Sequence, residues 1–156
     1  MEQALSFISM LISLFALFLS IFSFWQSRAS ATKEFFVQGD SVEMKQYRKA
    51  IYDIYNLNYS EEKILEELKL KTDEISHVVS FYDFWALMVK KKYLPKWTFQ
   101  ASSKYTMINV YNKIKPYIEY RRLTQPEYAS HFEWLVNQST KSKKRSNCHC
   151  FPSTYH

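Results

Sequence analysis

The stretch from Ala4 to Trp25 reads ALSFISMLISLFALFLSIFSFW and contains no charged residue. As a helix, these 22 residues extend about 33 Å, which is enough to cross the hydrocarbon core of a bilayer. Trp25 closes the stretch at the depth where aromatic side chains collect in membrane proteins. The stretch therefore predicts a transmembrane helix close to the N-terminus.

A secretory signal peptide is the alternative interpretation, because Ala29-Ser30-Ala31 resembles a small-residue cleavage site. We favour an anchor, since Glu2 precedes the apolar run without any Lys or Arg, and the run is longer than is usual in signal peptides. Arg28 and Lys33 follow the run. Under the positive-inside rule they place the C-terminal domain in the cytoplasm and the short N-terminus outside.

Small residues recur along this stretch at alternating spacings of three and four. They form what we call the serine seam: Ser6, Ser9, Ser13, Ala16, Ser20, Ser23, Ser27 and Ser30. Such a period is the geometry of left-handed helix contacts, and small side chains let helices approach closely in lipid. The seam predicts self-association, either as a dimer or small bundle, or as a ring with a hydroxyl-lined pore. Serines scattered through an ordinary anchor are the interpretation we favour least.

Composition excludes several classes of protein. The 156 residues include a single glycine, Gly39, which excludes Gly-rich phosphate loops and the dinucleotide-binding fingerprint. The formal net charge is +6, and the four basic residues Lys141, Lys143, Lys144 and Arg145 supply most of it. The rest of the chain is close to neutral, so no basic nucleic-acid groove is predicted. The two cysteines make no disulfide framework and suit the reducing cytoplasm.

Hydrophobic periodicity and capping residues predict helices along the rest of the chain. We expect the first helix to end at Gly39 and later ones to begin at Asp40, Ser60, Thr72, about Ser102 and Thr124. The segment Ile75–Val89 is apolar on most sides, which is typical of a helix at the centre of a bundle. The predicted fold class is all-α, with a single N-terminal transmembrane helix followed by a small cytoplasmic helical bundle. Its expected boundaries are 1–38 for the transmembrane helix and juxtamembrane extension, 40–138 for the bundle and 139–156 for a basic tail.

Few side chains suggest chemistry. His77 has Asp73 and Asp83 nearby in sequence, and we expect a buried, hydrogen-bonded structural histidine rather than a catalytic base. Glu127 and His131 are expected to share a helix face as a surface or capping pair. No Ser-His-Asp or paired-carboxylate set can be assembled from the sequence. We therefore predict that the protein is not an enzyme and uses no cofactor.

The end of the chain contains four residues of metal-ligating type, Cys148, His149, Cys150 and His156. Structural zinc sites usually space paired cysteines by about two to four residues, whereas a single residue separates these two. We therefore predict no metal site there. The lysines that precede the cysteines are expected to form a solvated tail, with contact to anionic lipid as the alternative.

Three segments resemble a bacterial family of membrane-tethered helical domains without assigned function. They are Phe81–Trp85 (FYDFW), Lys115–Arg122 (KPYIEYRR) and His131–Leu135 (HFEWL). The whole layout, one N-terminal membrane helix followed by a small helical domain, is also similar to the accessory membrane protein of RNA-targeting (type VI-B) CRISPR systems. That family carries a divergent HEPN-type helical domain, a fold associated with ribonucleases.

The second resemblance implies a homo-oligomeric, ring-shaped pore that depolarises the bacterial inner membrane during phage infection. Its implied partners are the lipid bilayer and an RNA-guided CRISPR effector. The HEPN motif separates an arginine from a histidine by more residues than lie between Arg145 and His149, and by fewer than lie between Arg122 and His131. Here Arg145 and His149 have three residues between them and Arg122 and His131 have eight, so neither pair matches. Arg145 and His149 are therefore only weak catalytic candidates.

We thus expect a self-assembling, pore-like effector or accessory protein of antiviral defence. A passive membrane anchor or scaffold that recruits a cytoplasmic partner is the first alternative. A membrane-tethered, HEPN-like ribonuclease is the second.

Overall fold

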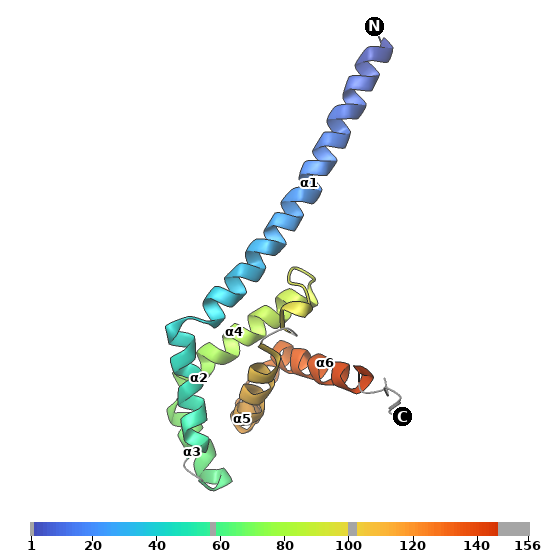
Figure 1. Cartoon of the computed structure of the whole chain (residues 1–156). Coiled ribbons are helices and arrows are strands. Elements are labelled where there is room, and N and C mark those ends of the chain that lie inside the picture. The colour runs from blue at the N-terminus through green and yellow to red at the C-terminus, as the bar shows by residue number, and fades with distance from the viewer. Residues whose placement is uncertain (1, 57–58, 100–102, 147–156) are drawn as a thin grey trace, which may run out of the picture.

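The structure is a computed structural model that describes residues 2–56, 59–99 and 103–146. Six helices make up most of this described part, which contains no strand. They are α1 (Glu2–Gly39), α2 (Val42–Tyr55), α3 (Glu61–Leu70), α4 (Thr72–Lys90), α5 (Lys104–Arg122) and α6 (Ser130–Ser146). The all-α class predicted from the sequence is confirmed (Figure 1).

α1 is one uninterrupted helix that projects far out of the bundle formed by the other helices (Figure 1). It is long and apolar enough to cross a membrane, and its most apolar window makes no buried contact with the rest of the protein. Only the last turns of α1 reach the bundle, where Phe35 is buried. The helix ends at Gly39, as predicted.

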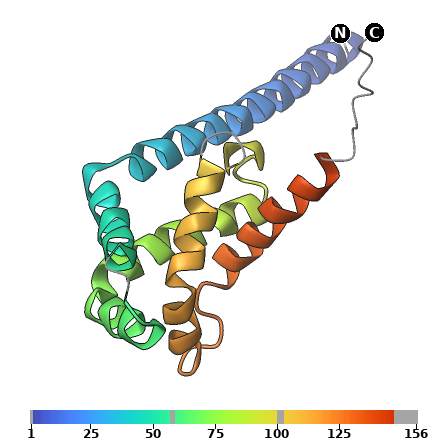
Figure 2. The same cartoon turned by 60° about the horizontal axis from the view of Figure 1, so that its bottom comes forward.

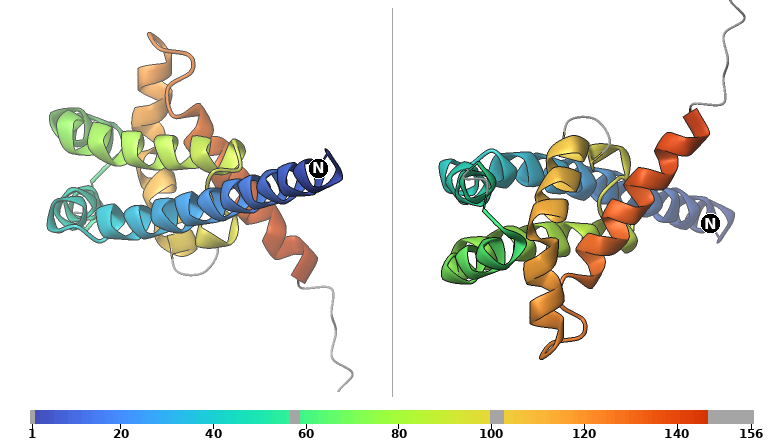
Figure 3. Two further views of the ribbon diagram at one scale, coloured as in Figure 1. Left: turned by 90° about the horizontal axis from the view of Figure 1, so that it is seen from above. Right: turned by 90° about the horizontal axis from the view of Figure 1, so that it is seen from below.

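α4 is the central helix of the bundle. It packs against α2 and α6, while α5 crosses it and packs against α2, α3 and α6 (Figures 2 and 3). The buried residues of α4 are Ile75, Val78, Val79, Tyr82, Trp85, Ala86 and Val89. Their 3.6-residue periodicity confirms that the apolar segment forms the centre of the core.

The prediction that His77 is buried is wrong. α4 keeps one exposed stripe, made of Asp73, His77, Ser80 and Phe84, which lie three or four residues apart. His77 stacks on the ring of Tyr47 from α2, with centroids 5.2 Å apart and planes inclined by 11°. The sequence suggested burial because most neighbours of His77 are apolar, but one side of even a central helix stays open here.

α2 begins one residue later than predicted. Ser41 is the N-cap, and its hydroxyl oxygen accepts a hydrogen bond from the backbone N–H of Met44 at 3.2 Å. Asp40 still continues the hydrogen-bond pattern of α1, because its backbone N–H donates to the carbonyl oxygen of Phe36 at 2.9 Å. The connection between α1 and α2 therefore consists of Asp40 and Ser41 alone.

The predicted helix start at Thr124 is wrong, because α6 begins only at Ser130 after a series of turns. Glu127 lies in these turns and does not share a helix face with His131. Ala129 has a φ of 59°, a left-handed backbone conformation that residues other than glycine rarely adopt. The reason for the late start is tertiary, since a carboxylate on α4 satisfies the first N–H groups of α6.

The expected tail is partly helical, because α6 continues through residues 139–146. Ser139 is buried and extends the inward stripe of Phe132, Leu135 and Val136 by one more turn. Lysine and arginine are good helix formers and are favoured near the C-terminal end of the helix dipole, so the basic run prolongs the helix.

Candidate functional site

Every position of the serine seam, from Ser6 to Ser30, is exposed in the structure. The hydrophobic core includes α1 only beyond the seam, where Ala31 and Phe36 pack against the core and Phe35 lies within it. The fold of a single chain therefore leaves the seam open to a second helix.

Ser13 shows how a seam hydroxyl is satisfied inside a single helix. Its Oγ donates to the carbonyl oxygen of Ser9 at 3.0 Å, and Thr32 makes the same kind of bond to Arg28 at 2.9 Å. Such bonds remove the cost of an unpaired donor in lipid. The hydroxyl oxygen can still accept a hydrogen bond from water or from a neighbouring helix.

Phe35 anchors the end of α1 in the bundle. Its side chain is 2% exposed, and its ring lies beside four other rings at centroid distances between 4.5 and 5.7 Å. These rings belong to Phe36, Phe81, Trp85 and Phe99. Aromatic pairs at such distances contribute about 0.5–1.5 kcal/mol each beyond the area they bury. The C-terminal end of α1 therefore lies inside the aromatic core of the bundle.

Gly39 allows the close approach of α1 to α4. A Cβ atom added at this position would lie 3.2 Å from Cζ of Phe81, which is closer than an ordinary contact. Gly39 has no positive φ, so the glycine provides space rather than the left-handed C-cap that glycine usually provides. Its carbonyl oxygen accepts a hydrogen bond from Arg48 Nη2 of α2 at 2.8 Å.

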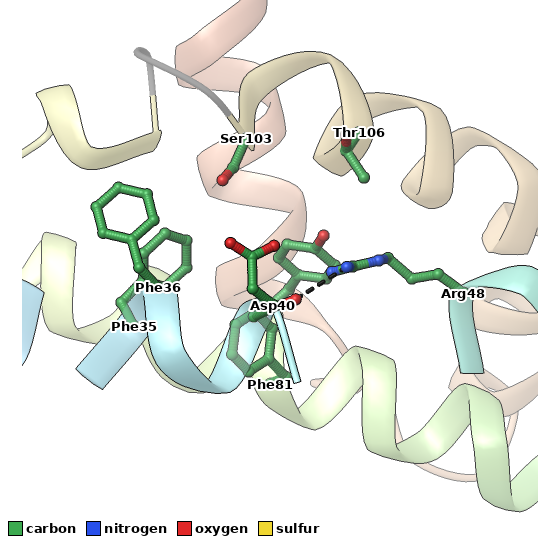
Figure 4. A pocket seen from close by; sticks show the side chains of 9 residues that line it. Phe35, Phe36, Asp40, Arg48, Phe81, Ser103 and Thr106 are labelled. Atoms are coloured by element: carbon green, nitrogen blue, oxygen red, sulfur yellow. Dashed lines mark hydrogen bonds between the residues drawn. The ribbon is translucent and has the colours of Figure 1, made fainter. Parts of the chain in front are cut away.

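A cavity of about 160 Å³ lies at this junction (Figure 4). Phe35, Phe36 and Phe81 form its apolar wall, and the guanidinium of Arg48 extends into it toward the Gly39 carbonyl. Burial raises the pKa of the Tyr82 hydroxyl in the same wall, although the charge of Arg48 opposes the rise. The side chain of Arg48 thus holds α2 against the end of α1. The cavity lies at this structural joint.

A second polar cluster joins α5 to α6. Arg122 Nη2 donates to Glu133 Oε2 at 2.7 Å, and its Nε donates to the carbonyl oxygen of Tyr128 at 3.0 Å. Burial, with the nearby Glu133 carboxylate, raises the pKa of Tyr111 to about 12, against the charge of Arg122. Arg122, one of the two arginines compared with the HEPN motif, is therefore engaged in this structural contact. Sequence reasoning missed it, because the turn that brings Arg122 to Glu133 was predicted as helix.

The weak catalytic candidates lie at or beyond the edge of the described residues. The backbone of Arg145 belongs to the last turn of α6, whereas its side chain and the whole of His149 are outside the description. The metal-ligating types Cys148, Cys150 and His156 also lie outside it. Within the described residues, no group of three or more His, Cys, Asp or Glu side chains could hold a metal ion.

These features define a class of protein, in which one long apolar N-terminal helix is joined directly to a small all-α bundle. The chain belongs to the family described as domain of unknown function DUF4760, which matches residues 5–139. The match includes most of α1 together with the bundle and ends within α6. No curated protein and no solved structure matches the chain.

Proposed function

We propose that this protein is a single-pass membrane protein that self-assembles through the serine seam and acts as a pore-like effector. The observation that carries the proposal is the exposure of all eight seam positions on a helix that the bundle leaves uncovered. Exposed Phe15, Leu17 and Phe18 lie off the seam and suit contact with lipid. The small seam residues suit close contact with copies of the same helix.

The membrane in this proposal is the bacterial inner membrane, with the N-terminus outside and the bundle in the cytoplasm. Arg28 and Lys33 support this orientation, because they follow the apolar run on the side of the bundle. The guanidinium carbon of Arg28 lies 5.7 Å from the ring centroid of Phe24. A basic side chain at the end of a membrane helix can extend its charge to the headgroup layer while its stem covers apolar surface.

The hydroxyls favour a pore over a seam that only packs. Seven of the eight seam positions are serine, although alanine or glycine would approach as closely without a polar atom. In a ring of copies the hydroxyls would face a lumen, where water completes their hydrogen bonds. The joint at Phe35 also supports assembly, because it would hold the bundles in one orientation around the ring.

Leucine substitution at the seam tests self-assembly. We expect Ser13→Leu combined with Ser20→Leu to disperse the oligomer, because bulk at the seam pushes helices apart. The matched control combines Phe15→Leu and Phe22→Leu, which place the same side chain off the seam. The mass of each detergent-solubilised protein, measured by light scattering after size exclusion, reports assembly. Equal masses for wild type and the seam variant would contradict the proposal.

Alanine substitution tests conduction separately. Ser13→Ala, Ser20→Ala and Ser23→Ala together keep the seam small, so the oligomer should persist while an apolar lumen loses water and conducts less. Ion flux across planar bilayers, compared with the oligomer mass of the same preparation, distinguishes the two properties. Wild-type oligomers that carry no current would assign the seam to a buried contact.

A scaffold that recruits a cytoplasmic partner is the second candidate. Ser13 favours it, because the bond to the Ser9 carbonyl already satisfies the hydroxyl donor without a lumen.

The biological role that we propose for the pore is antiviral defence linked to an RNA-guided CRISPR effector. It predicts an effector gene beside this one, and phage resistance that is lost with the seam leucines. Resistance that survives the seam leucines would contradict a defensive pore.

We propose no catalysis and no cofactor. Arg145→Ala with His149→Ala should leave the purified protein as inert toward RNA as the wild type. RNA cleavage by the wild type that disappears in this double variant would establish the ribonuclease alternative instead.

A further inference from the structure

We propose that the end of α4 and the segment following it contact anionic lipid headgroups of the membrane that α1 spans. The residues concerned are all exposed, and together we call them the α4 basic loop: Lys90, Lys91, Lys92, Tyr93, Lys96 and Trp97. The inference rests on the proposed membrane insertion of α1. It adds to that proposal the surface of the bundle that contacts the membrane and the class of lipid that this surface binds.

The position of the α4 basic loop brings it close to the membrane. It lies beside α1, and in Figure 1 it is the part of the bundle that extends farthest toward the N-terminal end of α1. Phe99, just after the loop, packs against Phe35 of α1 with ring centroids 4.5 Å apart. Trp25 lies about 15 Å farther along the helix axis, and the headgroup layer fills about 5–8 Å of that interval. Extended lysine side chains of the loop can therefore reach the headgroups.

The charge of the α4 basic loop suits an anionic partner. Between residues 84 and 118 the chain has seven lysines and no Asp or Glu. Four of these lysines belong to the loop, and all four are exposed. Each basic residue at an anionic membrane surface strengthens binding about fivefold. The charges therefore favour phosphatidylglycerol-type headgroups over zwitterionic ones.

The aromatic residues of the loop indicate a membrane surface rather than open water. Tyr93 and Trp97 are 58% and 57% exposed, whereas Leu94 between them is buried. Aromatic rings with a polar group collect at the level of the headgroups, where one end is apolar and the other wet. Two such rings among four lysines form the combination that binds an anionic interface.

The backbone at Lys92 gives the loop its shape. Lys92 has a φ of 66°, in the left-handed region that favours glycine. Its N–H donates to the carbonyl oxygen of Val89 at 3.0 Å, and the N–H of Tyr93 donates to that of Met88 at 2.9 Å. This Schellman arrangement reverses the chain, so that Tyr93 is exposed while Leu94 turns into the core. A lysine at this unfavourable position keeps one more charge on the surface facing the membrane.

The test uses the full chain in lipid nanodiscs, with Trp97 as the reporter. The discs contain phosphatidylcholine brominated close to the headgroup, with or without phosphatidylglycerol. The difference between wild type and Trp97→Phe isolates the quenching of Trp97, and Trp25→Phe does the same for Trp25 in α1. We expect phosphatidylglycerol to increase the quenching of Trp97, and high salt to reverse that increase.

Lysine variants test the charge. Lys91→Gln, Lys92→Gln and Lys96→Gln together should weaken the response of Trp97 to phosphatidylglycerol by about fivefold per lysine. The matched control removes the same number of charges at Lys63, Lys69 and Lys115, on α3 and the second half of α5. These parts lie at the end of the bundle remote from the membrane segment (Figure 1). Circular dichroism verifies that both variants keep the helix content of the wild type.

The outcomes separate the lipid contact from membrane insertion. Equal responses of Trp97 in the two lysine variants, with Trp25 still quenched, would overturn the lipid contact alone. Absence of Trp25 quenching in the wild type would overturn the insertion on which the contact depends. Shielding of Trp97 by RNA added to neutral discs, without a response to phosphatidylglycerol, would overturn the lipid assignment in favour of nucleic acid.

Discussion

One carboxylate oxygen of Asp83, on α4, lies 2.9 Å from the backbone nitrogen of Phe132, near the start of α6. The same oxygen accepts the N–H of His131 at 2.9 Å. The first N–H groups of a helix have no partner within it, and a negative charge there also complements the helix dipole. Asp83 therefore acts as the cap of α6 from another helix and ties α6 to the centre of the bundle.

Removing this cap should destabilise the bundle. We expect Asp83→Ala to lower the free energy of unfolding by about 1–3 kcal/mol, because two N–H groups lose their acceptor. Asp83→Asn should cost less, since its amide oxygen still accepts. Chemical denaturation in detergent, followed by circular dichroism, measures the change. The control is Asp73→Ala in the exposed stripe of α4, and an equal loss in that variant would contradict the capping role.

Phe35 should hold α1 and the bundle together as one unit. Phe35→Ala removes the ring at the centre of the aromatic contacts, and we expect it to lower the free energy of unfolding by about 3–5 kcal/mol. Phe18→Ala is the matched control on the exposed part of α1, where the bundle makes no contact. Limited proteolysis should cut the Phe35→Ala protein near Asp40 faster than either wild type or the control. Unchanged stability and cleavage would show that the joint depends on other contacts.

Lys92→Gly should stabilise the bundle, although it removes a charge. Glycine adopts the left-handed conformation of Lys92 freely, whereas lysine adopts it at a cost of about 1 kcal/mol. Lys91→Gly is the control, because Lys91 has a φ of −81° and gains nothing from glycine. Thermal unfolding of both variants should show opposite signs of the change. The stabilised Lys92→Gly protein would also separate folding from lipid contact, since it should fold better and respond less to phosphatidylglycerol.

Alkaline pH should destabilise the bundle through Tyr111. Its pKa is raised from 10.0 to about 12 in the folded chain, so the unfolded chain loses this proton first as the pH rises. The stability contributed by the neutral phenol is therefore complete below about pH 10 and is lost between about pH 10 and 12, to a total of at most about 3 kcal/mol. Denaturation curves across this range measure the loss. Tyr111→Phe should reduce the loss, and Tyr105→Phe, which removes the hydroxyl of an exposed tyrosine, is the matched control.

The extent of prediction from sequence differs between the elements. α1 and α4 were predicted well, because a long apolar run and an apolar periodicity are properties of each segment alone. The capping residue Ser60 and the start at Thr72 were also located correctly. The helix start predicted at Thr124 was wrong, since Arg122 binds the carbonyl oxygen of Tyr128 and Asp83 of α4 binds the N–H of His131.

By itself, the sequence determined where most of the helices lie, which one has the length and apolarity for a membrane, and where small residues form a seam along it. These properties depend on neighbours within one segment. Only the tertiary structure decided that His77 is exposed, that Asp83 caps α6 and that Phe35 anchors α1 in the bundle. The physical reason is that burial and hydrogen-bond partners are supplied by residues far away in the chain, and the packing of helices alone brings those residues together.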